Sequence, residues 1–268
     1  MKFKPGDFVT RRSYNSDIIF KVEHLQEGNA LLRSIKLRLM ADARLEDLIK
    51  VDKKEVKTLI RELMLESYDY LRRQELNLIL QDRIYRNNKN VGYRELPGDV
   101  LHIDGDRDYL EMSLQNYKNL RISAHGFYIP EKNLSAEIFS YLKKYNPDIL
   151  VITGHDGCLN DLCYHTSDYF IEAVKIARLY EKNRDELVIF AGACQSYYEK
   201  LITNGANFAS SPAGRLLHFL DPVMVVEKVA YTSFREVLQV KEVINTTITG
   251  EGGIGGIETR GKLRLLYP

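Results

Sequence analysis

Two reactive side chains each follow a run of apolar residues. Residues 148–153, with the sequence DILVIT, lead through a glycine into His155, and residues 186–193, with the sequence ELVIFAGA, lead into Cys194. A thiol beside an imidazole is the arrangement of a cysteine nucleophile with its general base. His155 would accept the thiol proton and later protonate the leaving amine, so the expected chemistry is acyl transfer. The alternative is a buried, inert Cys194, because free cysteine is among the most buried residue types.

Backbone amides around these two residues would complete the chemistry. The N–H groups of Asp156, Gly157 and Cys194 are expected to bind the oxyanion of a tetrahedral intermediate. The small residues before Cys194 leave room for a substrate backbone, and the glycines at 154 and 157 allow it to approach closely. Residues 197–202 have helical character, so a helix N-terminus is expected to favour the thiolate form of Cys194.

The spacing of the two apolar runs indicates the structure that positions them. Residues 168–180 lie between the runs and have the apolar periodicity of a helix. Two β-branched runs separated by an amphipathic helix are typical of a βαβ unit in a parallel sheet that is buried on both faces. Adjacent parallel strands end at the same edge of a sheet, so His155 and Cys194 are predicted to meet there.

The same alternation continues on both sides of this unit. Strands are predicted at 100–106, 120–126, 206–212 and 223–231, and helices at 109–119 and 136–145. This order predicts an α/β fold, with a mostly parallel sheet and helices on both faces. His125, at the end of the second strand, is a rival general base. The expected strand order places it beyond the first strand and away from Cys194.

The first part of the chain has a different character. Short strand candidates lie at 8–12, 18–22 and 30–35. Turn-rich segments separate them, so residues 1–52 are predicted to form a small SH3-like β module. Such a module can bind peptides or nucleic acid, or serve only as a spacer. Residues 53–97 are predicted to form a helical linker, and the alternating α/β domain is placed at 98–268.

The composition narrows the class of protein. Of the 268 residues, 44% are hydrophobic, enough for a substantial core, and 38 Lys and Arg balance 37 Asp and Glu. This balance gives no reason to expect nucleic acid or a membrane as a partner. Three cysteines without framework spacing favour a reducing cytoplasm. We expect no signal peptide and no run of about 18 apolar residues that could span a bilayer.

Two further patterns carry less weight. His155, Cys158, Cys163 and His165 resemble a metal-binding set, but they lack the two paired ligand arms of structural zinc sites, so no metal or cofactor is expected. Residues 256–262 match most of a phosphate-binding loop. The next residue is leucine instead of serine or threonine, and no helix is expected after it. The neighbouring glycines are expected to form a loop near the rim of the active site.

The two apolar runs and their reactive residues resemble a known family pattern. In the caspase, gingipain, legumain and clostripain group of cysteine peptidases, one hydrophobic block ends in His-Gly and a second ends in Ala-Cys or Gly-Cys. Residues 149–155 and 187–194 match this pattern, except that Asp156 stands before Gly157. The resemblance covers roughly residues 98–232. It implies a caspase-like, mostly parallel sheet with helices on both faces.

The whole chain also resembles a family of sporulation-specific cysteine proteases from spore-forming bacteria. Residues 4–11 (KPGDFVTR), residues 153–157 (TGHDG), the pair Ala193 and Cys194, and the glycine-rich tail carry this resemblance. It implies a cysteine endopeptidase that processes spore coat and cortex-associated proteins during sporulation. The expected location is the mother-cell cytoplasm or the spore coat. The resemblance also implies cleavage after Arg or Lys.

Cleavage after arginine requires an acidic group that pairs with the guanidinium. In this group of folds the end of the first strand lines the specificity pocket, and this chain has Asp104 and Asp106 there. An ordinary acidic turn is an equally good interpretation of these two residues. Gly192 stands where some Arg-specific relatives place an acid two residues before the nucleophile.

Two other functions fit parts of the sequence. Residues 192–196 (GACQS) resemble the nucleophile elbow of an amidotransferase-like hydrolase, but Ser196 stands where the elbow requires glycine, and the histidine precedes the cysteine. A non-catalytic assembly protein of the spore surface would use the N-terminal module as its binding arm. A separate hypothesis is self-processing at the basic linker, which contains Arg72, Arg73, Arg83 and Arg86.

Overall fold

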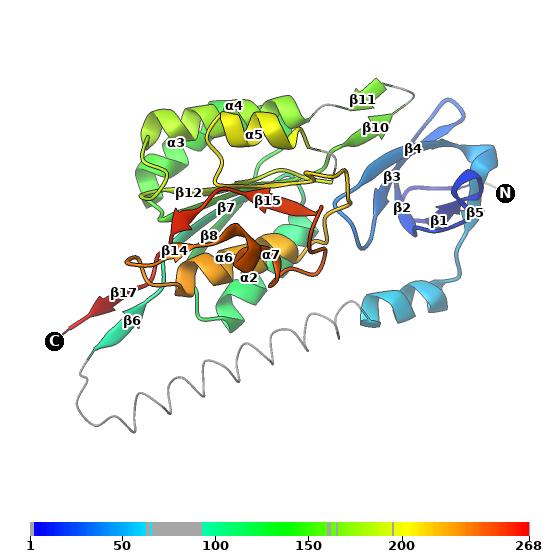
Figure 1. Cartoon of the computed structure of the whole chain (residues 1–268). Coiled ribbons are helices and arrows are strands. Elements are labelled where there is room, and N and C mark those ends of the chain that lie inside the picture. Colours follow the sequence, from blue (N-terminus) through cyan, green and yellow to red (C-terminus); the bar gives the residue numbers. More distant parts are fainter. Residues whose placement is uncertain are drawn as a thin grey trace.

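Two β-sheets organise the chain (Figure 1). The computed structural model describes residues 3–62, 65, 93–159, 162–164, 166–194 and 196–267, and for 157–159 and 162–164 it describes the backbone only. An antiparallel sheet lies near the N-terminus, and a mostly parallel sheet flanked by helices follows it. The predicted α/β class is therefore confirmed.

The N-terminal sheet consists of five short strands. They are β1 (Phe8–Arg11), β2 (Phe20–Gln26), β3 (Asn29–Ser34), β4 (Met40–Arg44) and β5 (Leu48–Lys50), in the spatial order β4-β3-β2-β1-β5. Side chains alternate between interior and solvent, so Val9, Phe20, Val22 and Leu32 are fully buried in a small core. The sequence predicts β1, β2 and β3 but not β4 and β5.

A helical segment at 53–62 follows β5. Most of the predicted linker, with the arginines at 72, 73, 83 and 86, lies outside the described residues. The description resumes near β6 (Arg94–Leu96), which pairs with the C-terminal strand β17 (Arg264–Leu266).

The larger sheet has five parallel strands and one antiparallel edge strand, in the order β15-β13-β12-β9-β7-β8. Its strands are β7 (Val100–Asp104), β8 (Ala124–Tyr128), β9 (Ile149–Thr153), β12 (Val188–Ala191), β13 (Phe208–Ser210) and β15 (Ile254–Gly256). Every residue of β7, β9 and β12 is buried. The continuous apolar runs of β9 and β12 predict this burial for central parallel strands. Strand β8, which carries His125, lies beyond β7 as expected, although it begins later than predicted.

Helices cover both faces of this sheet (Figure 1). On one side lie α3 (Leu134–Tyr145), α4 (Ser167–Tyr180) and α5 (Tyr198–Thr203), and on the other side lie α2 (Arg107–Asn119), α6 (Asp221–Tyr231) and α7 (Val240–Ile244). Neighbouring residues of a central strand enter different cores: Ile152 packs with the core that contains α4, and Val151 packs with the core that contains α6. This alternation follows from the two-residue period of a strand.

One predicted strand is wrong. Residues 223–231 (VMVVEKVAY) are rich in β-branched side chains, yet they belong to helix α6. Pro222 stands in the first turn of this helix, where its missing N–H has no intrahelical partner to lose. Most side chains of α6 are buried, so the run has no polar face, and periodicity does not separate a buried helix from a buried strand.

The segment after β9 forms an antiparallel hairpin. Strands β10 (Gly157–Leu159) and β11 (Leu162–Tyr164) pair with each other, and Cys158 lies opposite Cys163 in their register. The side chains of this hairpin, and all of His165, lie outside the described residues. The metal-binding alternative for these residues stays a hypothesis.

The glycine-rich tail contributes strands as well as loops. It supplies β15 and then β16 (Thr259–Arg260), which pairs with β14 (Val237–Leu238). Lys262 is buried, and its Nζ atom donates to the carbonyl oxygens of Asp185 and Glu186. This lysine stabilises the start of β12, which supports the rejection of a phosphate-binding loop. None of the helices among the described residues is long and apolar enough to cross a bilayer.

Gly192 follows β12 with a backbone conformation that other residues rarely adopt. Its φ is +126°, and a Cβ atom there would lie 2.2 Å from Ser210 Oγ. We expect Gly192→Ala to lower the free energy of unfolding by about 1–3 kcal/mol through backbone strain, with a further loss from displacing Ser210. Gly250→Ala is the control, because Gly250 also has a positive φ, of +66°, but no atom lies within 4 Å of its Cβ position. Urea unfolding measures the free energy of unfolding of both variants. Equal losses in Gly192→Ala and Gly250→Ala would contradict the steric part.

Candidate active site

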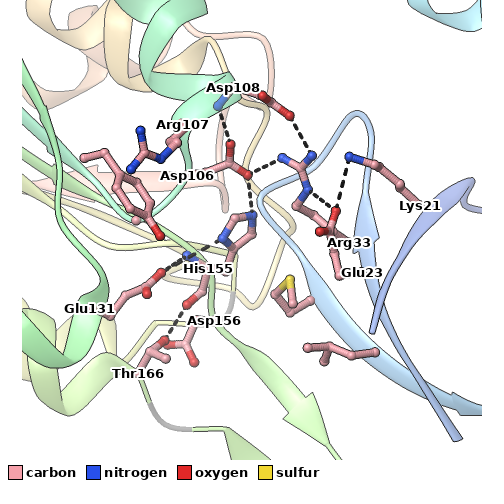
Figure 2. Close-up of a pocket in the computed structure, with 14 residues that line it drawn as sticks. Lys21, Glu23, Arg33, Asp106, Arg107, Asp108, Glu131, His155, Asp156 and Thr166 are labelled. Atoms are coloured by element: carbon pink, nitrogen blue, oxygen red, sulfur yellow. Dashed lines mark hydrogen bonds and ion pairs between the residues drawn. The ribbon is translucent and has the colours of Figure 1, made fainter. Parts of the chain in front are cut away.

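A cavity of about 500 Å³ lies where the N-terminal sheet meets the C-terminal edge of the parallel sheet (Figure 2). The N-terminal sheet contributes Lys21, Glu23, Leu31, Arg33 and Met40 to its wall. The rest of the wall consists of Gly105, Asp106, Arg107, Asp108, Tyr128, Glu131, His155, Asp156 and Thr166. Three residues singled out from the sequence, Asp106, His155 and Asp156, therefore share one cavity.

His155 lies just beyond β9, between two carboxylates. Its Nε2 atom is 3.0 Å from Asp106 Oδ2, and its Nδ1 atom is 4.0 Å from Glu131 Oε1. The backbone of His155 is held as well, because its N–H donates to Glu131 at 3.0 Å and its carbonyl oxygen accepts from the Thr166 hydroxyl. The imidazole is thus oriented towards Asp106, and Figure 2 shows this contact.

Asp106 connects three parts of the site. One of its oxygens accepts from the N–H groups of Asp108 and Tyr109 and so caps helix α2. The other lies near His155 and 2.5 Å from Arg33 Nη1. Burial acts to raise the pKa of Asp106, but the contacts with His155 and Arg33 outweigh it and hold the pKa well below its usual range. Asp106 is therefore a carboxylate anion that the N-terminus of α2, the His155 imidazole and the Arg33 guanidinium stabilise.

Asp104 ends β7 as part of a fully buried polar chain. Its Oδ2 atom accepts from Arg38 Nη1 at 2.7 Å and from the Thr153 hydroxyl at 2.8 Å. The Thr153 hydroxyl uses its proton to donate to Asp104, so the Thr153 oxygen accepts from Nε2–H of His102. The other ring nitrogen of His102 then accepts from the Tyr117 hydroxyl. Burial acts to raise the pKa of Asp104, but Arg38 and His102 outweigh it and lower the pKa to about 2.

Cys194 is fully buried beyond β12 and does not line the cavity. Its thiol donates to the carbonyl oxygen of Leu217 at 3.6 Å. Burial raises the pKa of the thiol to about 12, so the thiolate is a minor form at neutral pH in this arrangement. The expected stabilisation by a helix N-terminus is wrong for this state. Helix α5 begins only at Tyr198 and has six residues, so its dipole is weak and distant.

The strand ends come together as predicted, but the two side chains do not. Ile152 of β9 pairs with Ala191 of β12, and His155 and Cys194 each lie three residues beyond that pair. Yet the imidazole contacts carboxylates and the thiol contacts Leu217, and the hydrogen bonds of the described residues include none between His155 and Cys194. The backbone thus supports their juxtaposition, whereas the side chains point to different partners.

The proposed oxyanion donors lie at the same edge. Asp156 is buried, and its carboxylate accepts from the Ser167 hydroxyl. Its backbone forms a parallel bridge with Leu39 of the N-terminal part. Gly157 begins β10. The carbonyl oxygen of Cys194 accepts from Ser211, which fixes the backbone of the nucleophile candidate.

Four residues of the site escape sequence reasoning. Arg33 and Arg38 come from the N-terminal part, more than sixty residues before the carboxylates that they bind, so no local pattern connects them. The Tyr109 ring lies 6.0 Å from the His155 ring, which only the packing of α2 establishes. For Glu131 the sequence offers only an indirect signal, the glycines at 105 and 154. A Cβ atom at these positions would lie 2.2 Å and 2.5 Å from Glu131 Oε1, so the glycines make room for its carboxylate.

The comparison with known proteins decides the family. The family described as YabG peptidase U57 matches residues 4–268. This chain belongs to that family. It is 44% identical, over an aligned length of 293 residues, to the sporulation-specific protease YabG of Bacillus subtilis (strain 168), covering 100% of this chain and 99% of that relative. No solved structure matches the chain. The resemblance to sporulation proteases is confirmed, and the chain is a sporulation-related protease.

The lowered pKa of Asp104 makes a pH-dependent contribution to stability. A carboxylate whose folded-state pKa, here about 2, lies below its ordinary value of 3.8 stabilises the fold above the ordinary value. That stabilisation is lost as the pH falls towards the lower value. We expect urea unfolding to give a lower free energy of unfolding at about pH 3 than at about pH 5, with a smaller difference in Asp104→Asn. Equal differences in the two proteins would refute this role of Asp104.

Proposed function

We propose that this protease is a cysteine endopeptidase in which Cys194 is the nucleophile and His155 is the general base. The register of β9 and β12 is the observation that carries the proposal, because it sets both residues at equal distances beyond one paired position. Neighbouring strands lie about 4.8 Å apart, so side chains at equal distances beyond two neighbouring strands start from backbone positions that are close together.

The proposed base has an orienting partner. Asp106 is an anion in contact with His155, as the carboxylate partner of a catalytic imidazole must be. In the proposed active arrangement one ring nitrogen keeps a carboxylate contact while the other accepts the thiol proton. This role explains why Asp106 is nearly buried and is fixed by the N-terminus of α2.

The proposed reaction is acyl transfer through a thioester. The Cys194 sulfur attacks the carbonyl carbon of the scissile peptide bond, and the thiol proton passes to His155. Backbone N–H groups of Asp156, Gly157 and Cys194 stabilise the oxyanion. His155 then protonates the leaving amine, and water hydrolyses the thioester to release the carboxylic acid product and restore the thiol.

The proposed specificity is for Arg, and for Lys, on the N-terminal side of the cleaved bond. Asp104 supports this proposal, because it ends the first strand of the parallel sheet and holds a guanidinium in a fully buried ion pair. Asp106 is the second candidate, and it pairs with Arg33 at the wall of the cavity. Both acids therefore have the chemistry that recognition of a basic side chain requires.

The biological setting proposed here follows from the family. Spore coat and cortex-associated proteins are the proposed substrates, processed in the mother-cell cytoplasm or at the spore coat, and self-processing is part of the proposal. The strand order β13-β12-β9-β7-β8 and the helices on both faces support a caspase-like domain at 98–268. The five antiparallel strands support an SH3-like module at 1–52, with the linker at 53–97 between them.

Cys194→Ala tests the proposed nucleophile. We expect the rate of cleavage of a coat-protein mixture to fall by at least about a thousandfold, because no other group in the proposed reaction forms the acyl intermediate. Mass spectrometry of the products, with mapped cleavage sites, measures the rate, and thermal unfolding establishes that the variant is folded. Cys163→Ala is the matched control and keeps wild-type cleavage. Unchanged processing by Cys194→Ala would refute the cysteine mechanism and favour another class of protease.

Asp104→Asn and Asp106→Asn separate specificity from catalysis. Losing the partner of a buried charge costs about 3–5 kcal/mol, so Asp104→Asn is expected to lower kcat/KM for Arg peptides by about 10²–10⁴-fold. Asp106→Asn is expected to lower kcat for every cleavable peptide, because His155 loses its orienting anion. Fluorogenic peptides that differ only in the residue before the cleaved bond measure both effects. Asp168→Asn, on the exposed start of α4, is the control. Full activity in both site variants would remove the two assignments.

A further inference from the structure

Residues 35–39 connect β3 to β4 and lie outside their own sheet. They form the loop of the β3–β4 hairpin, which the bond from Ser34 N–H to the Leu39 carbonyl oxygen closes, and this loop contacts two segments at the C-terminal edge of the parallel sheet. Leu37 forms an antiparallel bridge with His218, and Leu39 forms a parallel bridge with Asp156. The loop is thus held through its backbone at two points, on either side of Arg38.

The same segment is held from a third direction by Tyr109 of α2. The Tyr109 hydroxyl lies 3.0 Å from the carbonyl oxygens of both Ser34 and Leu37. Its ring lies under the guanidinium of Arg38, whose Cζ atom is 4.9 Å from the ring centroid. Tyr109 thus contacts the backbone of the segment and the one charged side chain that it sends into the interior.

Arg38 fills an acidic pocket in the middle of the segment. Its side chain has no exposed surface, and it forms an ion pair of 2.7 Å with Asp104, which is also fully buried. Two of its nitrogens, Nε and Nη2, have no hydrogen-bond partner among the described residues. Burying a charge with one partner contributes little to stability, and an apolar side chain of the same size is often as stable there. The pocket is therefore explained better by recognition of a guanidinium than by folding.

The backbone of Arg38 lies against the thiol of Cys194. The Arg38 N–H is 3.5 Å from the Leu217 carbonyl oxygen, which is the oxygen that the thiol contacts at 3.6 Å. A hydrogen bond with the Arg38 backbone also acts to lower the pKa of the Cys194 thiol, against the larger effect of burial. A basic side chain in the acidic pocket and a backbone at the thiol are the two features that a bound substrate would have.

We propose that residues 35–39 are an internal inhibitory loop, which places Arg38 where the arginine of a substrate would bind, covers Cys194 and keeps the enzyme latent. The site that the loop covers lies between Leu217–His218 and Asp156, and it takes peptides with arginine between two aliphatic residues, as Leu37, Arg38 and Leu39 are arranged here. This inference rests on the proposed function of Cys194 and Asp104. It adds the ligand class of the site and a mode of regulation.

Three features of the occupied state explain latency. Leu39 engages the backbone of Asp156, one of the proposed oxyanion donors. Cys194 is fully buried and remains outside the cavity that contains His155. Arg33, on the same hairpin as the segment, pairs with Asp106 and Asp108 and so holds the N-terminal sheet against the site. Activation requires this loop to leave, and a substrate that carries arginine competes for the same carboxylate.

The first test measures access to Cys194 in the full-length protein. Alkylation by iodoacetamide is followed at Cys194 by peptide mass spectrometry, a readout that needs no turnover. We expect Arg38→Met to react at least about tenfold faster than wild type, because the open form becomes more populated. Tyr109→Phe, which keeps the ring and removes the hydroxyl, is expected to react at an intermediate rate. Arg44→Met, at an arginine whose side chain is 80% exposed on the same module, is the control and keeps the wild-type rate.

The second test uses the segment as a free peptide. A synthetic peptide of residues 34–40 (SIKLRLM) is expected to slow alkylation of Cys194 in Arg38→Met, whereas the same peptide with methionine for arginine is not. Cleavage of Arg peptides is measured in parallel, and Arg38→Met is expected to exceed wild type. Circular dichroism and thermal unfolding verify that each variant is folded. If Arg38→Met does not fold, the alkylation rate of Cys194 in Tyr109→Phe is the test.

The outcomes separate the two proposals. Faster alkylation in Arg38→Met without any peptide cleavage would overturn the proposed peptidase activity and leave the covering of Cys194 by the loop intact. Peptide cleavage with unchanged alkylation in both Arg38→Met and Tyr109→Phe would overturn the inhibitory loop and leave the peptidase intact.

Discussion

The ion pair between Arg38 and Asp104 joins the two sheets of this protein at the edge where its candidate active site lies. Neither side chain has any exposed surface, so the attraction between them acts where water does not screen it. The pair fixes the loop between β3 and β4 across the edge of the parallel sheet. The position of that loop in turn determines what surrounds Cys194 and what closes one wall of the cavity.

A second carboxylate organises the other half of the site. Asp106 caps α2, contacts His155 and pairs with Arg33, and these contacts together outweigh the cost of its burial. Two acids that are separated by one residue at the end of one strand therefore have distinct neighbours. Asp104 faces the interior and the loop, whereas Asp106 faces the cavity and the imidazole. This division is the physical basis for proposing that Asp104 sets specificity and that Asp106 orients the base.

Much of the architecture could be predicted from patterns along the chain. Continuous apolar runs predict β9 and β12 because a strand buried on both faces has no polar side, and the helix between them follows from its period. The same absence of a polar face made α6 look like a strand, since a helix that is buried almost all round carries no amphipathic signal. The alternation also predicts that His125 lies away from Cys194, because strand order follows from connectivity.

The sequence by itself determined which groups end the central strands, namely His155, Cys194 and the pair Asp104 and Asp106. A strand delivers its last side chains to one edge wherever the rest of the chain lies. Only the tertiary structure decided what those groups touch. Arg33 reaches Asp106 from a separate sheet, Arg38 reaches Asp104 from the loop between β3 and β4, and the thiol meets Leu217 instead of the imidazole. Contacts between segments that are distant in sequence depend on how two folded layers pack, and no local pattern encodes that packing.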